Sequence, residues 1–200
     1  MPNTPNKLRL KDNITECIDH GYTDDTVARK IYCFDKSPIL ELDEYKSTVF
    51  DIINSVSNDL RIPIRNIYIT GSAQTGYSYT KDHDFNAKKS DLDLAVVSPK
   101  IFAKYLDEVF NVTKRYTDNT KFESTQDIKD FRNYIAKGML KIEYMPQCKM
   151  RILWEQYFND LSNSYIDIFK NINCCIYLTE KIFEWKQVNL LENYRNDNHA

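Results

Sequence analysis

Ile67-Tyr-Ile-Thr-Gly-Ser-Ala-Gln-Thr-Gly76, followed by Ser90-Asp-Leu-Asp-Leu-Ala-Val-Val97, is the stretch that decides the fold. Two of the chain's four glycines fall within it, and Gly71 directly follows a β-rich apolar run. Glycine loses the most conformational freedom on folding, so its placement here indicates a tight turn that approaches another group closely. Asp91 and Asp93 occupy alternate positions of a strand-like run and therefore point to one face. Two carboxylates on one face repel each other, which predicts a cation between them.

The composition is that of an ordinary globular protein, with 42% hydrophobic and 28% charged residues among 200. This length suffices for a buried core and favours one compact domain. The net charge of −2 gives no global basic field, so any nucleic-acid contact would be a local patch. No stretch suits a signal peptide or a membrane span, and the five cysteines lack metal-ligand spacing. The sequence therefore predicts a cytoplasmic protein with free thiols, no membrane partner and no zinc site.

Hydrophobic periodicity predicts an α/β (α+β) domain with a small mixed sheet flanked by helices. Residues 1–40 are expected to form an N-terminal arm, mobile over residues 1–12, and a short helix; the main domain then covers residues 41–195. Residues 196–200 are expected to fray, and Trp154 and Trp185 to lie in the core. The predicted helices span residues 42–60, 98–110, 124–137, 149–163 and 180–194, and the predicted strands residues 66–70, 91–97 and 173–178.

The order of a helix, an apolar strand, a Gly-Ser turn and an Asp-x-Asp strand resembles the nucleotidyltransferase fold of the DNA polymerase β superfamily. The matching residues are Gly71, Ser72, Asp91 and Asp93, with Ser90 before the first aspartate. The resemblance covers about residues 43–110 and is strongest to small, single-domain bacterial members. It implies a nucleotidyltransferase fold with extra C-terminal helices. It also implies a place in toxin–antitoxin or phage-defence modules, where small stand-alone members often occur.

The chemistry of a nucleoside triphosphate suits these residue types. Gly71 and Ser72 can present backbone N–H groups and a hydroxyl to the phosphates. Asp91 and Asp93 can hold Mg²⁺ or Mn²⁺, because hard cations take carboxylate and phosphate oxygens as ligands. Lys89, one of three lysines near this stretch, is a candidate to steady the triphosphate, and Ser90 is a candidate nucleotide-binding residue beside the acid pair.

A second acid pair, Asp82 and Asp84, lies closer to Ser72 and fits the family's usual spacing better. The residues after it are polar and loop-like, whereas Asp91 and Asp93 lead into a buried strand. A catalytic pair needs a rigid element to fix its geometry, so the sequence favours Asp91 and Asp93. Residues 77–89 are then expected to form a polar loop beside the site.

The family's third carboxylate comes from a later strand, beside the first two, where it binds metal and can deprotonate the attacking hydroxyl. Glu143 and Asp167 both stand in apolar-acid-apolar patterns that fit a strand, although Asp167 fits a helix equally well; they are the candidates, with Glu143 preferred. The predicted strand at residues 173–178 carries no acid. The absence of a third acid therefore stays open as an alternative.

The resulting expectation is a Mg²⁺-dependent nucleotidyltransferase that moves a nucleoside monophosphate from an NTP onto a hydroxyl and releases pyrophosphate. The acceptor is a small molecule, an RNA end or a partner protein. The alternative is a catalytically degenerate module of the same fold that binds a nucleotide or a partner protein. A weaker reading is a structural domain whose aspartates are surface residues. The sequence indicates neither the base nor the oligomeric state.

Overall fold

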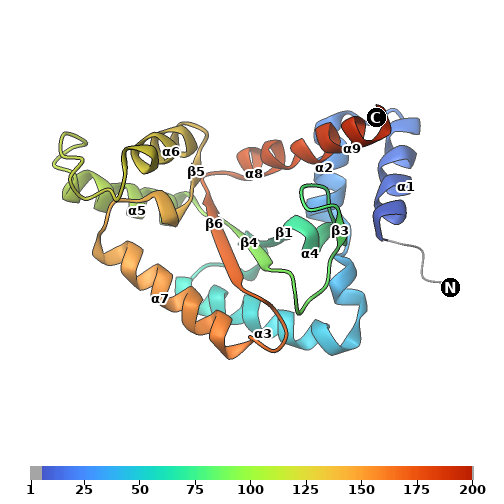
Figure 1. Cartoon of the computed structure of the whole chain (residues 1–200), viewed down its shortest axis with the longest axis horizontal. Helices are drawn as coiled ribbons and strands as arrows, with labels where there is room; N and C mark the ends of the chain where they lie inside the picture. The colour runs from blue at the N-terminus through green and yellow to red at the C-terminus, as the bar shows by residue number, and fades with distance from the viewer. Residues whose placement is uncertain (1–5, 200) are drawn as a thin grey trace.

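The computed structural model describes residues 6–199 and has a mixed α/β architecture, as the sequence predicts (Figure 1). None of the helices in this range is long and apolar enough to cross a membrane. The helices are α1 (Asn6–Asp19), α2 (Asp24–Arg29), α3 (Asp43–Leu60), α4 (Gly71–Thr75), α5 (Pro99–Val112), α6 (Thr125–Ala136), α7 (Lys149–Ser164), α8 (Glu180–Gln187) and α9 (Asn189–His199). The strands are β1 (Ile67–Thr70), β2 (Tyr77–Ser78), β3 (His83–Asp84), β4 (Leu92–Val97), β5 (Met139–Leu140) and β6 (Ile172–Tyr177).

The main sheet has four strands in the order β1-β4-β6-β5. β4 pairs antiparallel with β1 and parallel with β6, while β5 adds a short antiparallel strand at the edge. The sheet is therefore small and mixed, as expected. In this register Asp93 of β4 stands opposite Thr70 on one side and Asn173 on the other.

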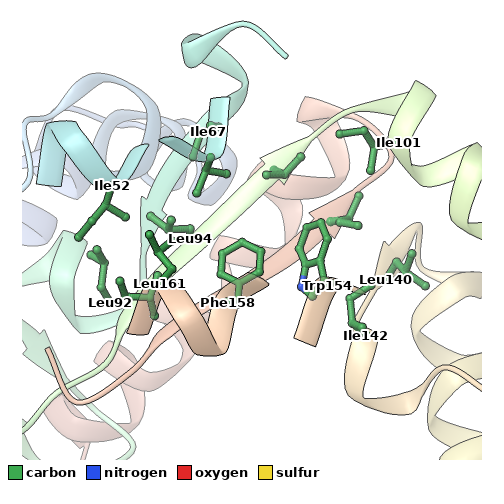
Figure 2. Packing of buried hydrophobic residues seen from close by; sticks show 14 of the residues in the cluster. Ile52, Ile67, Leu92, Leu94, Ile101, Leu140, Ile142, Trp154, Phe158 and Leu161 are labelled. Carbon is green, nitrogen blue, oxygen red and sulfur yellow. The ribbon is translucent and has the colours of Figure 1, made fainter. Parts of the chain in front are cut away.

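One face of the sheet carries the larger core. Side chains alternate along a strand, so Leu92 and Leu94 point to this face and are almost completely buried. Helices α3, α5 and α7 cover it, and Figure 1 shows α3 and α7 running side by side below the strands. Figure 2 shows part of this core as sticks; the labelled residues are Ile52, Ile67, Leu92, Leu94, Ile101, Leu140, Ile142, Trp154, Phe158 and Leu161.

The opposite face of the sheet carries a second core, built from both ends of the chain. Ala95, Val97 and Tyr177 point to this face and pack with residues of α1, α2, α8 and α9. Phe183 of α8 stacks on Tyr68, with ring centroids 4.6 Å apart. Asp93 belongs to this face because it lies two residues before Ala95. The acid pair is thus on the side of the sheet that α8 covers.

The short helix α4 is held by polar bonds to the segment before α3. The side-chain amide of Gln74 donates to the carbonyl oxygens of Ile31 (2.7 Å) and Asp35 (3.1 Å). Ile31 belongs to the π-helical turn Lys30–Phe34, and Asp35 is the residue that directly follows this turn. The hydroxyl of Ser37 donates to the carbonyl of Ala73 at 2.6 Å. These bonds fix the turn that follows β1.

Four expectations about the two ends of the chain are wrong. Residues 6–12 belong to α1, so the predicted arm is helical wherever the structure describes it; residues 1–5 lie outside the described range. Residues 196–199 of the segment expected to fray belong to α9, and residue 200 lies outside the described range; the predicted helix 180–194 is two helices that divide at Val188. Trp185 is 49% exposed, whereas Trp154 lies in the core as predicted.

Two local predictions around the candidate site are also wrong. Glu143 stands in a 3₁₀ turn, Ile142–Tyr144, and Asp167 in a turn after α7, so neither acid is on a strand. Residues 77–89 include the two-stranded hairpin β2–β3 and are not loop throughout. The predicted strands of the sheet are present as β1, β4 and β6, and Ser98 caps α5 by accepting from the N–H of Ile101 at 3.2 Å.

Candidate functional site

Gly71 and Asp93 lie against each other although twenty-two positions separate them in the chain. A Cβ atom added to Gly71 would lie 2.7 Å from Oδ2 of Asp93, closer than a real Cβ contact allows. Gly71 also has a φ of +59°, in the left-handed region that favours glycine. A side chain at residue 71 would therefore force the Asp93 carboxylate or the turn after β1 to shift.

Both aspartates accept a hydrogen bond from an asparagine: Asn173 lies on β6, and Asn171 directly precedes that strand. Asn171 donates its side-chain amide to Oδ1 of Asp91 at 3.1 Å, and Asn173 donates to Oδ1 of Asp93 at 3.0 Å. Asn173 is the register partner of Asp93 across the β4–β6 ladder. One lone-pair site of each carboxylate is thus occupied, and Oδ2 of Asp93 is the oxygen that faces Gly71.

The surroundings of Asp93 disfavour its ionised form. Burial raises the pKa of this carboxyl above its ordinary value, and the negative charge of Asp91 raises it further. The amide of Asn173 and the charges of Lys81 and Lys141 act in the opposite direction but do not cancel the rise. A bound cation would stabilise the ionised carboxylate, so the electrostatics of the pair suit a metal.

A pocket of about 730 Å³ opens beside Asp93 and Gly71. It continues over β6 toward Lys141 and Glu143 on one side and Lys186 of α8 on another. A smaller pocket of about 180 Å³ lies on the other side of Gly71, and Ser72 lines only this one. Lys186 lines both pockets, so α8 borders the Gly-Ser turn as well as Asp93; Asp91 lines neither pocket.

The two candidates for a third acid have different positions. Glu143 lines the pocket that contains Asp93, although it is exposed and lies 3.4 Å from Nζ of Lys141. Asp167 is exposed and is not among the lining residues. On β6, the strand beside β4, the residue opposite Asp93 is Asn173, which has no carboxylate.

The remaining predicted nucleotide-binding residues are less central than expected. The hydroxyl of Ser90 is buried and accepts from the backbone N–H of Asn86 at 3.2 Å, which is a structural bond within the loop. Lys89 is exposed and lines neither pocket. The lysine of this loop whose charge acts on Asp93 is Lys81.

The alternative acid pair lies in the hairpin. Asp82 binds the hydroxyl of Tyr77 and pairs with Lys7 of α1 at 2.9 Å, and these two partners hold its pKa below the ordinary value. Asp84 is exposed in β3. Neither acid lines the pocket beside Gly71, and Asp82 has a structural role in holding the hairpin to α1.

Within residues 6–199 there is no cluster of three or more His, Cys, Asp or Glu residues that could hold a metal. The candidate metal site therefore consists of two carboxylates, Asp91 and Asp93. Mg²⁺ is commonly bound by one or two carboxylates together with substrate phosphates and water, so the donor set fits a metal that arrives with a nucleotide.

Comparison with known proteins does not assign the chain. No family model matches the sequence, and neither a curated protein nor a solved structure matches the chain. The functional interpretation consequently rests on the residues and their geometry.

Sequence reasoning did not identify four of the polar residues that meet at the site: Asn171, Asn173, Lys141 and Lys186. The asparagines follow Asp91 by about eighty positions, and only strand pairing brings them together. One signal for Asn173 is present in the sequence: the predicted strand 173–178 contains no acid, and Asn173 is its one side-chain amide.

Replacing Gly71 with alanine tests the close approach to Asp93. Gly71→Ala is expected to lower the free energy of unfolding by about 2–5 kcal/mol, from backbone strain and from the clash with the carboxylate. The matched control is Gly21→Ala, because Gly21 has a φ of +78° but open space around its Cβ position. The control should lose only about 1–2 kcal/mol. Equal losses in urea denaturation would contradict the close approach.

The pH dependence of stability tests the environment of Asp93. A raised pKa in the folded state means that the protonated carboxyl favours folding; this contribution is present at low pH and disappears as pH rises above about 4. In EDTA, Asp93→Asn should therefore exceed wild type in stability by about 0.5–2 kcal/mol at pH 7, and by less at pH 4.5. The control Asp84→Asn should stay within about 0.5 kcal/mol at both pH values. An Asp93→Asn protein less stable than wild type at pH 7 would point to a structural carboxylate.

Proposed function

We propose that this chain is a Mg²⁺-dependent nucleotidyltransferase, which transfers a nucleoside monophosphate from an NTP to a hydroxyl group and releases pyrophosphate. The observation that carries the proposal is the contact between Gly71 and the Asp93 carboxylate. It joins the turn that suits phosphate binding to the acid pair that suits a metal. A structural domain with surface aspartates has no need for this approach.

Asp91 and Asp93 would hold the metal, and their environment fits this role. Burial, together with the neighbouring charge of Asp91, raises the pKa of Asp93, so a bound cation would favour its ionised form. When bound, Mg²⁺ supplies neutralisation of the phosphate charge and polarisation of the phosphorus that is attacked. Asn171 and Asn173 fix the orientation of the two carboxylates through the amide hydrogen bonds to their Oδ1 atoms.

In the proposed reaction, the hydroxyl oxygen of the acceptor forms a bond to the α-phosphorus of the NTP. The bond between that phosphorus and the oxygen bridging to the β-phosphate breaks, and both bonding electrons leave with pyrophosphate. The proton of the hydroxyl passes to a base or to water. Besides Asp93, two acids line the pocket, Glu143 and Glu155; Glu155 pairs with Arg151 at 2.7 Å, so Glu143 is the candidate to accept the proton.

The Gly71-Ser72 turn would hold the triphosphate, with the hydroxyl of Ser72 and backbone N–H groups as donors. The acceptor would enter over β6, from the side where the pocket reaches Glu143. At about 730 Å³ the pocket has the size of a small-molecule site, and it is open enough for the end of an RNA or a loop of a partner protein.

A second candidate function is supported by Asn173. Because the residue opposite Asp93 on β6 is an amide and not a carboxylate, and because residues 6–199 contain no three-acid metal group, the chain fits a nucleotide-binding module without catalysis. Such a module would bind an NTP with its metal at the same turn and acid pair. A partner protein would then recognise the nucleotide-bound form of the module.

A labelling experiment separates the two functions. The protein is incubated with Mg²⁺ or Mn²⁺ and each α-labelled NTP, with and without cell extract, beside an Asp91→Ala/Asp93→Ala control. Label transfer by wild type should fall by about 10²-fold or more in the control, the usual effect of removing a catalytic group. Transfer that survives the double substitution would refute the assigned site.

Asn173→Asp, tested in the same assay, extends the result. A third carboxylate adds a metal ligand and a base, so transfer should increase. If wild type is silent and Asn173→Asp is active, the chain is the binding module. If neither is active but NTP with Mg²⁺ raises the melting temperature of wild type, the module is again supported. If no NTP binds, both functions are refuted.

A further inference from the structure

The far end of the larger pocket contains more positive charge than the proposed reaction uses. Lys141 and Lys186 both line it, and Lys137 lies close enough for its charge to act on Lys186. Glu143, 3.4 Å from Lys141, is the one carboxylate that pairs with these lysines within residues 6–199. Lys186 itself forms no ion pair in that range.

The surroundings of Lys186 disfavour its charged form. Its side chain is half-buried at the end of α8, and burial together with the charges of Lys141 and Lys137 lowers the pKa of its ammonium group. An ammonium group that is partly removed from water normally acquires a counter-charge. The residue is thus an unsatisfied cation at the wall of a pocket.

Lys141 is held in place beside it. Nζ of Lys141 lies 5.0 Å from the ring centroid of Tyr134 and 5.7 Å from that of Tyr144, and the two rings are stacked. Burial acts to lower the pKa of Lys141, but Glu143 and the two tyrosines outweigh it and raise the pKa overall. Lys141 is consequently a charged group at a fixed position, oriented before any ligand arrives.

We propose that this end of the pocket is a phosphate subsite, in which Lys141 and Lys186 bind a phosphate monoester carried by the acceptor. Two lysines match the double negative charge of a phosphate monoester better than the single charge of a carboxylate. The same pocket is lined by Asp93, so a small molecule anchored by its phosphate can present a hydroxyl to the metal site. The acceptor would then be a phosphorylated hydroxyl compound; this identification rests on the proposed function, whereas the phosphate subsite does not.

The triphosphate of the NTP is the other source of the same chemistry. Lys186 also lines the small pocket beside Ser72, so the terminal phosphates could reach it from the opposite side. Lys141 lines only the larger pocket, beyond β6, which favours the acceptor. The two sources differ in whether a bound NTP leaves room for a further phosphate.

The test uses inorganic phosphate as the probe, in EDTA and without nucleotide, so it does not depend on transfer activity. Calorimetric titration should show binding to wild type that weakens by about tenfold or more in Lys186→Gln and in Lys141→Gln, because each removes one charge-assisted contact. Lys181→Gln, an exposed lysine on the same helix, is the matched control and should bind like wild type. Asp91→Ala/Asp93→Ala should retain phosphate binding. Absence of binding to wild type, or equal binding by all lysine variants, would overturn the subsite.

Two additional measurements complete the test. NMR titration of the lysine side chains of wild type should show the pKa of Lys186 rising when phosphate is added, and an unchanged pKa would count against the subsite even if a variant misfolds. Phosphate titration is then repeated in the presence of a saturating non-hydrolysable NTP analogue with Mg²⁺. Phosphate that still binds supports the acceptor, whereas phosphate displaced by the analogue assigns the lysines to the triphosphate and refutes the acceptor assignment.

Discussion

The close approach of the Gly71 backbone to the carboxylate of Asp93 is the contact on which the candidate site depends. Any side chain at position 71 would enter the space of that carboxylate, so the turn and the acid pair constrain each other. The constraint extends outward on both sides. Gln74 and Ser37 tie α4 to the segment before α3, and Asn173 ties Asp93 to β6. The segment before α3 therefore helps to position the Gly71 turn, and β6 helps to position the Asp93 carboxylate.

The two ends of the pocket are lined by groups of opposite charge. At its acid end, burial and the nearby charge of Asp91 raise the pKa of Asp93; at its basic end, Lys141 pairs with Glu143, whereas Lys186 has no ion-pair partner within residues 6–198. The ionised forms of Asp93 and Lys186 are each disfavoured by their surroundings. Charged groups in such environments are frequent at binding sites, because a bound ligand of opposite charge stabilises them. A metal-bound NTP together with a phosphorylated acceptor would satisfy both ends. This complementarity connects the proposed function to the phosphate subsite.

The sequence predicts local features of the fold well and non-local ones poorly. Ser98 and Pro99 predict the start of α5, and alternating polarity predicts β4, because these signals lie within a few residues of one another. The sequence does not predict α1, because the segment is mostly polar. Its only buried residues are Leu10, Ile14 and Cys17, and they pack against the second core, most of whose other members are distant in sequence. Similarly, Trp185 lies on the outer side of α8, where helix periodicity alone cannot tell core from surface.

The same distinction holds for the site. Asp91, Asp93 and Gly71 were found from the sequence because each belongs to a short pattern, and the structure brings the last two into contact. Asn173 and Lys186 belong to no pattern and arrive through the β4–β6 pairing and the packing of α8. Glu143 is not on a strand, because β5 ends at Leu140 and residues Ile142–Tyr144 form a 3₁₀ turn.

The most direct test of the metal assignment is the electron paramagnetic resonance spectrum of Mn²⁺ bound to a non-hydrolysable NTP analogue. If Asp91 and Asp93 hold the metal, adding wild-type protein should change the spectrum, because carboxylate oxygens replace water ligands. Adding Asp91→Asn/Asp93→Asn protein should leave the spectrum of the free Mn²⁺–nucleotide complex. A spectrum that wild type leaves unchanged, or that both proteins change equally, would contradict the assignment.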